Sequence, residues 1–146
     1  MSNSSQLSSE KGSPAKAIIT GASIDIIGSV IIGVILAIVY GIILSGSGLS
    51  TEEITTRFET LDPYSAFSII GAIVGCFISM VSGYVCARIV NYSEYKYGAV
   101  LGLISSTFGI ILGSSTYSIA EKITLVILTF ASVMLGVWVH VNDKAK

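Results

Sequence analysis

The chain has 146 residues, of which 52% are hydrophobic and 12% are charged, and its mean hydropathy is +0.82. This composition excludes an ordinary soluble domain, and because each membrane-spanning helix takes about 20 residues, the length excludes a large soluble catalytic domain. The net charge is −1 and the eight Lys and Arg residues form no basic stripe, so we do not expect nucleic acid as a partner. The sequence therefore predicts an integral membrane protein whose partner is the lipid bilayer.

Residues 1–16 are rich in Ser and carry almost no apolar side chain, so we expect a disordered cytoplasmic tail. The apolar segment 17–44 follows this tail. It is too long for the core of a signal peptide and contains Asp25, which favours a retained signal anchor. Cleavage behind it, in the Ser-Gly repeat of residues 45–48, is the alternative.

A longer loop separates this segment from the next. Ser50 and Glu53 have the spacing of a capping box, and apolar residues recur at helical spacing after them. We expect a short amphipathic helix over 51–60 that lies at the membrane surface. Asp62 is expected to cap the next helix, with Pro63 in its first turn.

Three further apolar segments occupy 64–90, 95–113 and 118–141. Because hydrocarbon cannot satisfy an exposed backbone N–H or C=O group, we expect unbroken apolar segments of this length to be helices. The connections 91–94 and 114–117 are short, so neighbouring helices should form antiparallel hairpins. The prediction is an all-α, four-helix transmembrane domain over 17–141, followed by a cytoplasmic tail at 142–146.

The distribution of Lys and Arg predicts the orientation of these helices. With the N-terminus inside, two basic residues lie outside, Arg57 and Lys122. Six lie on the cytoplasmic side: Lys11, Lys16, Arg88, Lys96, Lys144 and Lys146. Both termini are therefore expected in the cytoplasm.

Small residues spaced by four recur along the first three apolar segments, and we assign them to helix packing. They are Gly21, Ser29, Gly33 and Gly41; Gly71, Gly75, Ser79 and Gly83; and Gly98, Gly102, Gly109 and Gly113. Side chains this small let helix backbones approach closely in lipid. We expect these helices to meet along the rows, within one bundle or between subunits, and the first to touch two neighbours because its row drifts around the helix. The alternative is that glycine is simply common in membrane helices.

Asp25 lies inside the first apolar segment, where a carboxylate is energetically unfavourable unless it faces protein. The nearest expected cation is Arg88, at the end of segment 64–90, and Tyr84 lies one turn before it. In one interpretation, Asp25 and Arg88 form an intramembrane polar pair with Tyr84 that locks two helices together. In the other, Asp25 titrates and couples proton movement to a substrate. A third interpretation is that a cation from a partner protein pairs with Asp25.

The sequence carries no nucleophile paired with a base, no phosphate-binding loop and no metal-ligand spacing, so we expect neither enzyme activity nor a cofactor. Cys76 and Cys86 are expected to be small apolar residues and not a redox pair.

Residues 82–88 read Ser-Gly-Tyr-Val-Cys-Ala-Arg, and residues 97–102 read Tyr-Gly-Ala-Val-Leu-Gly. This resembles uncharacterised small four-helix bacterial inner-membrane proteins, which carry Gly-Gly-Tyr-Val-Ala-Ala-Arg at the end of one span, a His-Gly start to the next and an Asp in the first span. Ser82, Cys86 and Tyr97 depart from that pattern. The resemblance implies a bacterial inner membrane and no assigned activity.

Two functions therefore remain open. The first is a non-enzymatic membrane protein that assembles through its glycine-rich faces, as a homo-oligomer or an accessory subunit. The alternative is a small proton-coupled transporter or channel that uses Asp25.

Overall fold

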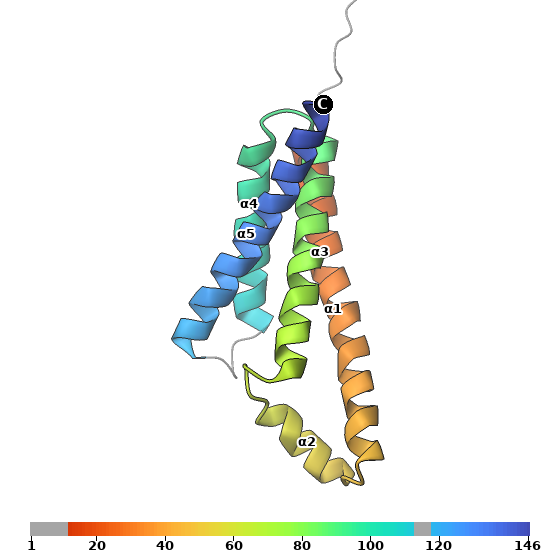
Figure 1. Cartoon of the computed structure of the whole chain (residues 1–146). Coiled ribbons are helices and arrows are strands. Elements are labelled where there is room, and N and C mark those ends of the chain that lie inside the picture. The colour runs from red at the N-terminus through yellow and green to blue at the C-terminus, as the bar shows by residue number, and fades with distance from the viewer. Residues whose placement is uncertain (1–11, 113–117) are drawn as a thin grey trace, which may run out of the picture.

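The computed structural model of the chain describes residues 12–112 and 118–146, which confirm the all-α prediction (Figure 1). The helices are α1 (Pro14–Gly46), α2 (Thr51–Glu59), α3 (Ala66–Val90), α4 (Glu94–Leu112) and α5 (Ile119–Lys144). Their ends lie within three residues of the predicted bounds. The predicted tail is corrected at 14–16, because Ser13 caps α1 and Pro14 opens it.

Serine side chains cap the N-terminal ends of α1, α2, α3 and α5. Ser50 and Glu53 form the predicted capping box at the start of α2, and the Ser50 N–H donates to Glu53 Oε2 over 2.8 Å. This backbone N–H, together with the Ser50 hydroxyl, lowers the pKa of Glu53. The predicted cap at Asp62 is wrong. The chain makes one more turn after Pro63, so that Ser65 caps α3, while Asp62 accepts the backbone N–H of Tyr64.

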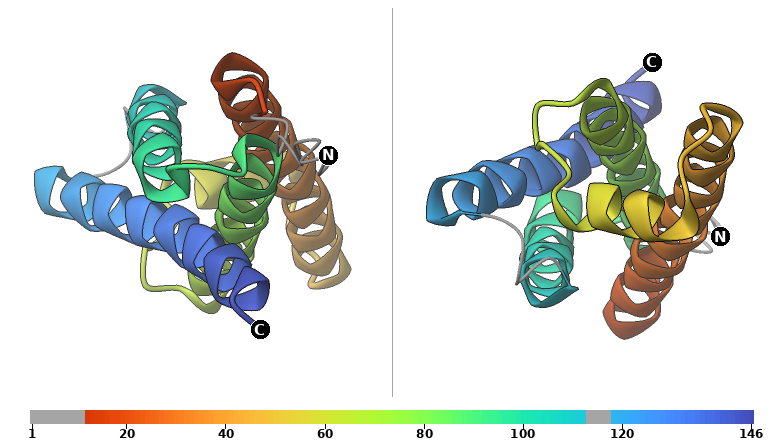
Figure 2. Two further views of the ribbon diagram at one scale, coloured as in Figure 1. Left: turned by 90° about the horizontal axis from the view of Figure 1, so that it is seen from above. Right: turned by 90° about the horizontal axis from the view of Figure 1, so that it is seen from below.

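The helix ends gather at two ends of the molecule. At the terminal end, which Figure 1 shows uppermost, α1 and α4 begin and α3 and α5 finish. There Lys144 Nζ donates to Asn91 Oδ1 over 2.7 Å and lies 3.2 Å from Glu94 Oε1. At the other end, α2 crosses beneath the helices between α1 and α3 (Figure 2). Thus α1 and α4 run parallel, and α3 and α5 run against them.

The tightest packing lies at the terminal end. A core of buried residues joins four helices there: Ala17, Cys86, Val90, Leu101 and Val133. Toward the α2 end, the α4–α5 pair diverges from α1 and α3 (Figure 1). The four helices are therefore joined at one end and splayed at the other.

Three helices, α1, α3 and α5, are long and apolar enough to cross a membrane. The shorter α4, which opens with Glu94 and Lys96, does not count among them. Large apolar side chains such as Ile42 and Ile73 are exposed along the helices, as a lipid-facing surface requires. These features indicate a membrane protein.

Candidate functional site

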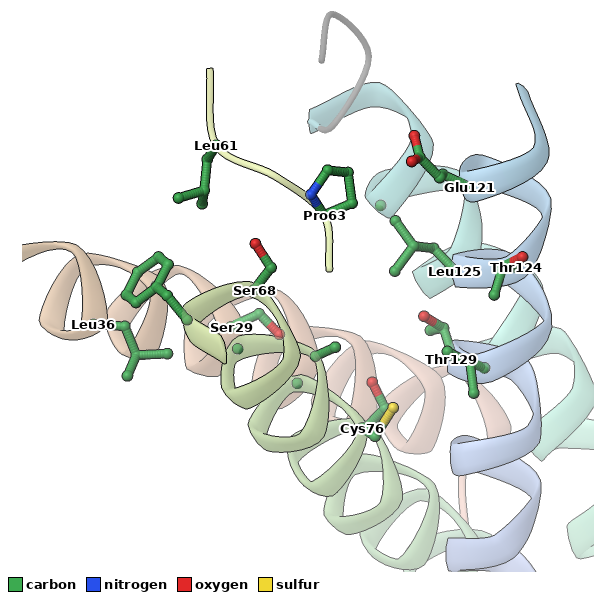
Figure 3. A pocket seen from close by; sticks show the side chains of 18 of the residues that line it. Ser29, Leu36, Leu61, Pro63, Ser68, Cys76, Glu121, Thr124, Leu125 and Thr129 are labelled. Carbon is green, nitrogen blue, oxygen red and sulfur yellow. The ribbon is translucent and has the colours of Figure 1, made fainter. Parts of the chain in front are cut away.

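A cavity of about 700 Å³ occupies the space between the splayed helices. Residues of α1, α3, α4 and α5 line it, and residues of α2 and the linker after it lie at its wide end. Figure 3 shows Ser29, Ser68 and Cys76 on one wall, Thr124 and Thr129 of α5 on the other. A volume of this size accommodates a drug-sized molecule.

Asp25 lies at the narrow end of this cavity, where its side chain is 5% exposed. Ser79 of α3 donates its hydroxyl to Asp25 Oδ1 over 2.7 Å. One turn toward the terminal end, Ser82 donates to the carbonyl oxygen of Gly21 over 2.9 Å. Two hydroxyls of α3 therefore hold the part of α1 that carries the carboxylate.

Ser105 of α4 lies at the same level of the cavity. A Cβ added to Gly21 would lie 2.7 Å from Leu101 Cδ2, so these two residues mark the contact between α1 and α4. Because the two helices run parallel, Asp25 and Ser105 each follow that contact by one turn. Ser105 is 4% exposed, and its Oγ has no hydrogen-bond partner among the residues that the structure describes.

The wide end of the cavity is aromatic. Phe58, Tyr64 and Phe67 line it, whereas Phe108 lies one turn beyond Ser105 on α4, nearer the floor. The ring of Phe67 stacks on Tyr40 with 4.3 Å between centroids, and Phe58 meets Tyr40 edge to face, which attaches α2 to the rim. The cavity thus runs from an aromatic mouth to a polar floor formed by Asp25, Ser79 and Ser105.

Among the described residues that line this cavity, Asp25 and Glu121 carry charge, and both are acidic. Glu121 lies at the mouth, where it accepts the N–H of Ser118 over 2.7 Å as part of an unpredicted capping box. The electrostatic character of the cavity is therefore acidic.

The structure corrects the predicted pairing of Asp25 with Arg88. Arg88 is exposed, and within residues 12–112 and 118–146 the ion pair formed is that of Lys144 with Glu94. Tyr84 turns toward α5, where its ring meets His140 edge to face at 5.4 Å between centroids. The reason is the distance along α3. Arg88 lies more than two turns beyond Ser79, too far along the helix to reach the carboxylate of Asp25.

The predicted packing residues separate into two groups. Toward the terminal end, neighbouring atoms lie against Gly21, Gly83, Gly98 and Gly102. Toward the α2 end, a Cβ on Gly33, Gly41, Gly75 or Gly109 would meet nothing within 4 Å, and one on Gly71 would touch Leu36 only at 3.9 Å. Gly33, Gly71, Gly75 and Gly109 line the cavity, as do Ser29 and Ser79, while Gly113 lies outside the described residues.

The backbones of α3 and α5 approach each other closely. A Cβ on Gly83 would overlap the carbonyl of Val133, and one on Gly136 would overlap that of Met80. The prediction that the small-residue rows of the first three apolar segments meet one another is wrong for Gly83, which contacts α5 instead. The row of α5 that supplies Gly136 also contains Ser132 and His140.

Sequence reasoning missed two of the three floor residues in their observed roles. Ser79 was assigned to packing, although a hydroxyl that near a buried acid is a natural donor. Ser105 was not singled out, and its signal was a pair of adjacent serines inside an apolar segment. Neither cysteine is bridged, as expected for Cys76 and Cys86.

In the described part of the chain, no three His, Cys, Asp or Glu side chains are grouped to hold a metal ion. Comparison with family models, curated proteins and solved structures found no match. The resemblance to small inner-membrane proteins therefore stays a prediction.

Proposed function

We propose that this chain is a non-enzymatic, multi-pass membrane protein that moves protons, alone or coupled to a solute, with Asp25 as the titrating group. The observation that carries the proposal is the position of Asp25. Among residues 12–112 and 118–146 it is the one buried side chain of an Asp, Glu, Lys or Arg, and it lies at the closed end of a large cavity. An ionisable residue inside the membrane points to function unless a partner neutralises it, and the partner here is a neutral hydroxyl.

The proposal includes four membrane spans, with α4 as the fourth. A Cβ on Gly102 would lie 2.8 Å from the ring of Phe130, so α4 lies closely against α5. The excess of Lys and Arg at the terminal end supports a cytoplasmic location for that end. The proposed membrane is the bacterial inner membrane, which is supported by the sequence resemblance alone. The cavity then opens toward the outer side.

Movement of a proton past Asp25 requires a route through the core, because Leu101 and Cys86 are fully buried on its cytoplasmic side. The crossing of α3 and α5 at Gly83 and Gly136 offers a pivot, since neither glycine has a side chain and the two backbones lie in direct contact there. Rocking of one helix pair about this crossing closes the outer opening and loosens the core, the general form of alternating access.

Proton flux in proteoliposomes tests the proposal. Wild-type protein should dissipate an imposed pH gradient, unaided or when an organic cation, neutral solute or anion is added, after subtraction of flux in protein-free liposomes. Asp25→Asn should reduce this flux by about tenfold or more, because it cannot exchange a proton. Glu52→Gln, which removes an exposed carboxyl on α2, is the matched control and should be unchanged. Equal flux in Asp25→Asn and wild type, or no flux with any of these solutes, would overturn the proposal.

The second candidate is self-assembly, or assembly with another membrane protein, through glycine-rich faces. It is favoured by α1, whose most apolar stretch contains no buried residue and whose Gly41 meets no atom that a Cβ would touch. Native mass measurement in mild detergent tests it. Assembly predicts a defined oligomer, or co-purification of a distinct subunit, that Gly41→Leu weakens, whereas a monomer under all conditions contradicts it.

A further inference from the structure

We propose that the cavity binds a protonated amine attached to an apolar body, with the ammonium group at the floor formed by Asp25, Ser79 and Ser105. This ligand class deepens the proposed function, because it assigns a solute to the same cavity. Charge, hydrogen bonding and shape each support it.

The charge of the cavity favours a cation. Its described lining holds two carboxylates and no Lys or Arg, so an anion would find repulsion at both ends. The floor carboxylate is largely withdrawn from water, and a buried charge calls for a partner of opposite sign. A neutral ligand would leave Asp25 without that partner.

The hydrogen-bonding capacity of the floor matches an ammonium group, which donates and never accepts. The Oδ1 atom of Asp25 accepts the hydrogen bond from Ser79, and no residue of 12–112 or 118–146 is recorded as a donor to Oδ2. The Ser79 hydroxyl already donates its one proton to Asp25, so its oxygen can only accept a further hydrogen bond. Ser105 is buried and unpartnered, a rare condition that a donor in the cavity relieves.

The walls favour an apolar body on the amine. Above the floor, glycine and small polar residues leave the cavity wide, with Phe108 about one turn from Ser105 and the rings of Phe58, Tyr64 and Phe67 at the mouth. An amine that carries a phenyl ring on a chain of several carbons places the ring along these walls near Phe108, one turn beyond Ser105 on α4. The ammonium group and a proton compete for Asp25, so binding to the protonated carboxyl releases one proton to water.

Three probes with one apolar body and different head groups test this ligand class. They are 4-phenylbutylamine, 4-phenylbutanol and 4-phenylbutyrate, titrated by calorimetry into the full chain in mild detergent. We expect the amine to bind about tenfold or more tightly than the other two, because only it makes charge-assisted hydrogen bonds to Asp25. Calorimetry in two acidic buffers of different ionisation heat should show proton release with the amine and none with the alcohol.

Two variants locate the binding site, and one serves as control. Asp25→Asn should weaken amine binding by about tenfold or more, and Ser105→Ala by about threefold to tenfold. Glu52→Gln should bind like wild type. If Asp25→Asn fails to fold by its melting curve, Ser105→Ala still tests the site, since it removes a hydroxyl that has no partner in the protein.

Equal affinity for the three probes, or amine binding unchanged in the folded variants, would overturn the ligand class. These outcomes differ from failure of the proposed function. Asp25-dependent proton flux with a neutral or anionic solute keeps the function and rejects the amine, whereas Asp25-dependent amine binding without proton flux keeps the ligand and rejects transport.

Discussion

At the scale of single residues, the environment of Asp25 is made by hydroxyls and not by a cation. The hydrogen bond from Ser79 joins α1 to α3 within the bundle, and both partners are about 95% withdrawn from solvent, at 5% exposure each. A neutral donor stabilises the carboxylate but leaves its charge uncompensated. The site is therefore available to a proton or a cation, which a buried salt bridge would exclude.

This environment predicts different effects on stability for two substitutions on α3. Ser79→Ala should lower the free energy of unfolding by about 1–3 kcal/mol, because it leaves a buried acceptor without its donor. Arg88→Ala should change stability little, because Arg88 is exposed and makes no ion pair in the described structure. Thermal unfolding in detergent measures both. A large loss of stability in Arg88→Ala, with no loss in Ser79→Ala, would instead support the predicted pair of Asp25 and Arg88.

At the scale of helices, the sequence predicted each element well and their contacts only in part. Helical spacing and the Ser50 capping box predict where helices lie because those signals are local. A row of small residues shows that a helix face is narrow but not which helix meets it. The spacing therefore predicts packing at Gly75, where the structure is open, and does not single out Gly136, where two backbones meet. The same row that brings backbones together near Gly83 leaves an open volume near Gly75, because the helices diverge between them.

The two kinds of glycine predict different responses to one methyl group. Gly136→Ala should destabilise the protein by about 1–3 kcal/mol, because its Cβ would meet the backbone of α3, which cannot move independently of that helix. Gly41→Ala is the matched control. It should leave stability unchanged or raise it by up to about 1 kcal/mol, because the space is open and alanine favours helix. Equal destabilisation by both, in thermal or denaturant unfolding, would mean that the α3–α5 crossing is not the tight contact.

At the scale of the whole molecule, most basic residues lie at the end where the helices are joined. Arg88 and Lys96 lie where the helices are joined, together with Lys16, Lys144 and Lys146, whereas Arg57 and Lys122 lie at the splayed end. Since basic residues are retained in the cytoplasm, the joined end should face inward and the aromatic mouth outward. An outward mouth means that solutes enter from outside and that Asp25 receives protons from that side.

Cysteine labelling in intact cells tests this orientation. Cys76 lines the cavity and is replaced by Ala, while Cys86 is fully buried and is kept. In that background, Arg57→Cys on the exposed face of α2 should react with a membrane-impermeant maleimide added outside, and Lys146→Cys should react only after permeabilisation. The reverse result would turn the mouth toward the cytoplasm, so that Asp25 would be loaded from inside. Partial labelling of both positions would show two orientations in one membrane, which the six-to-two distribution of Lys and Arg argues against.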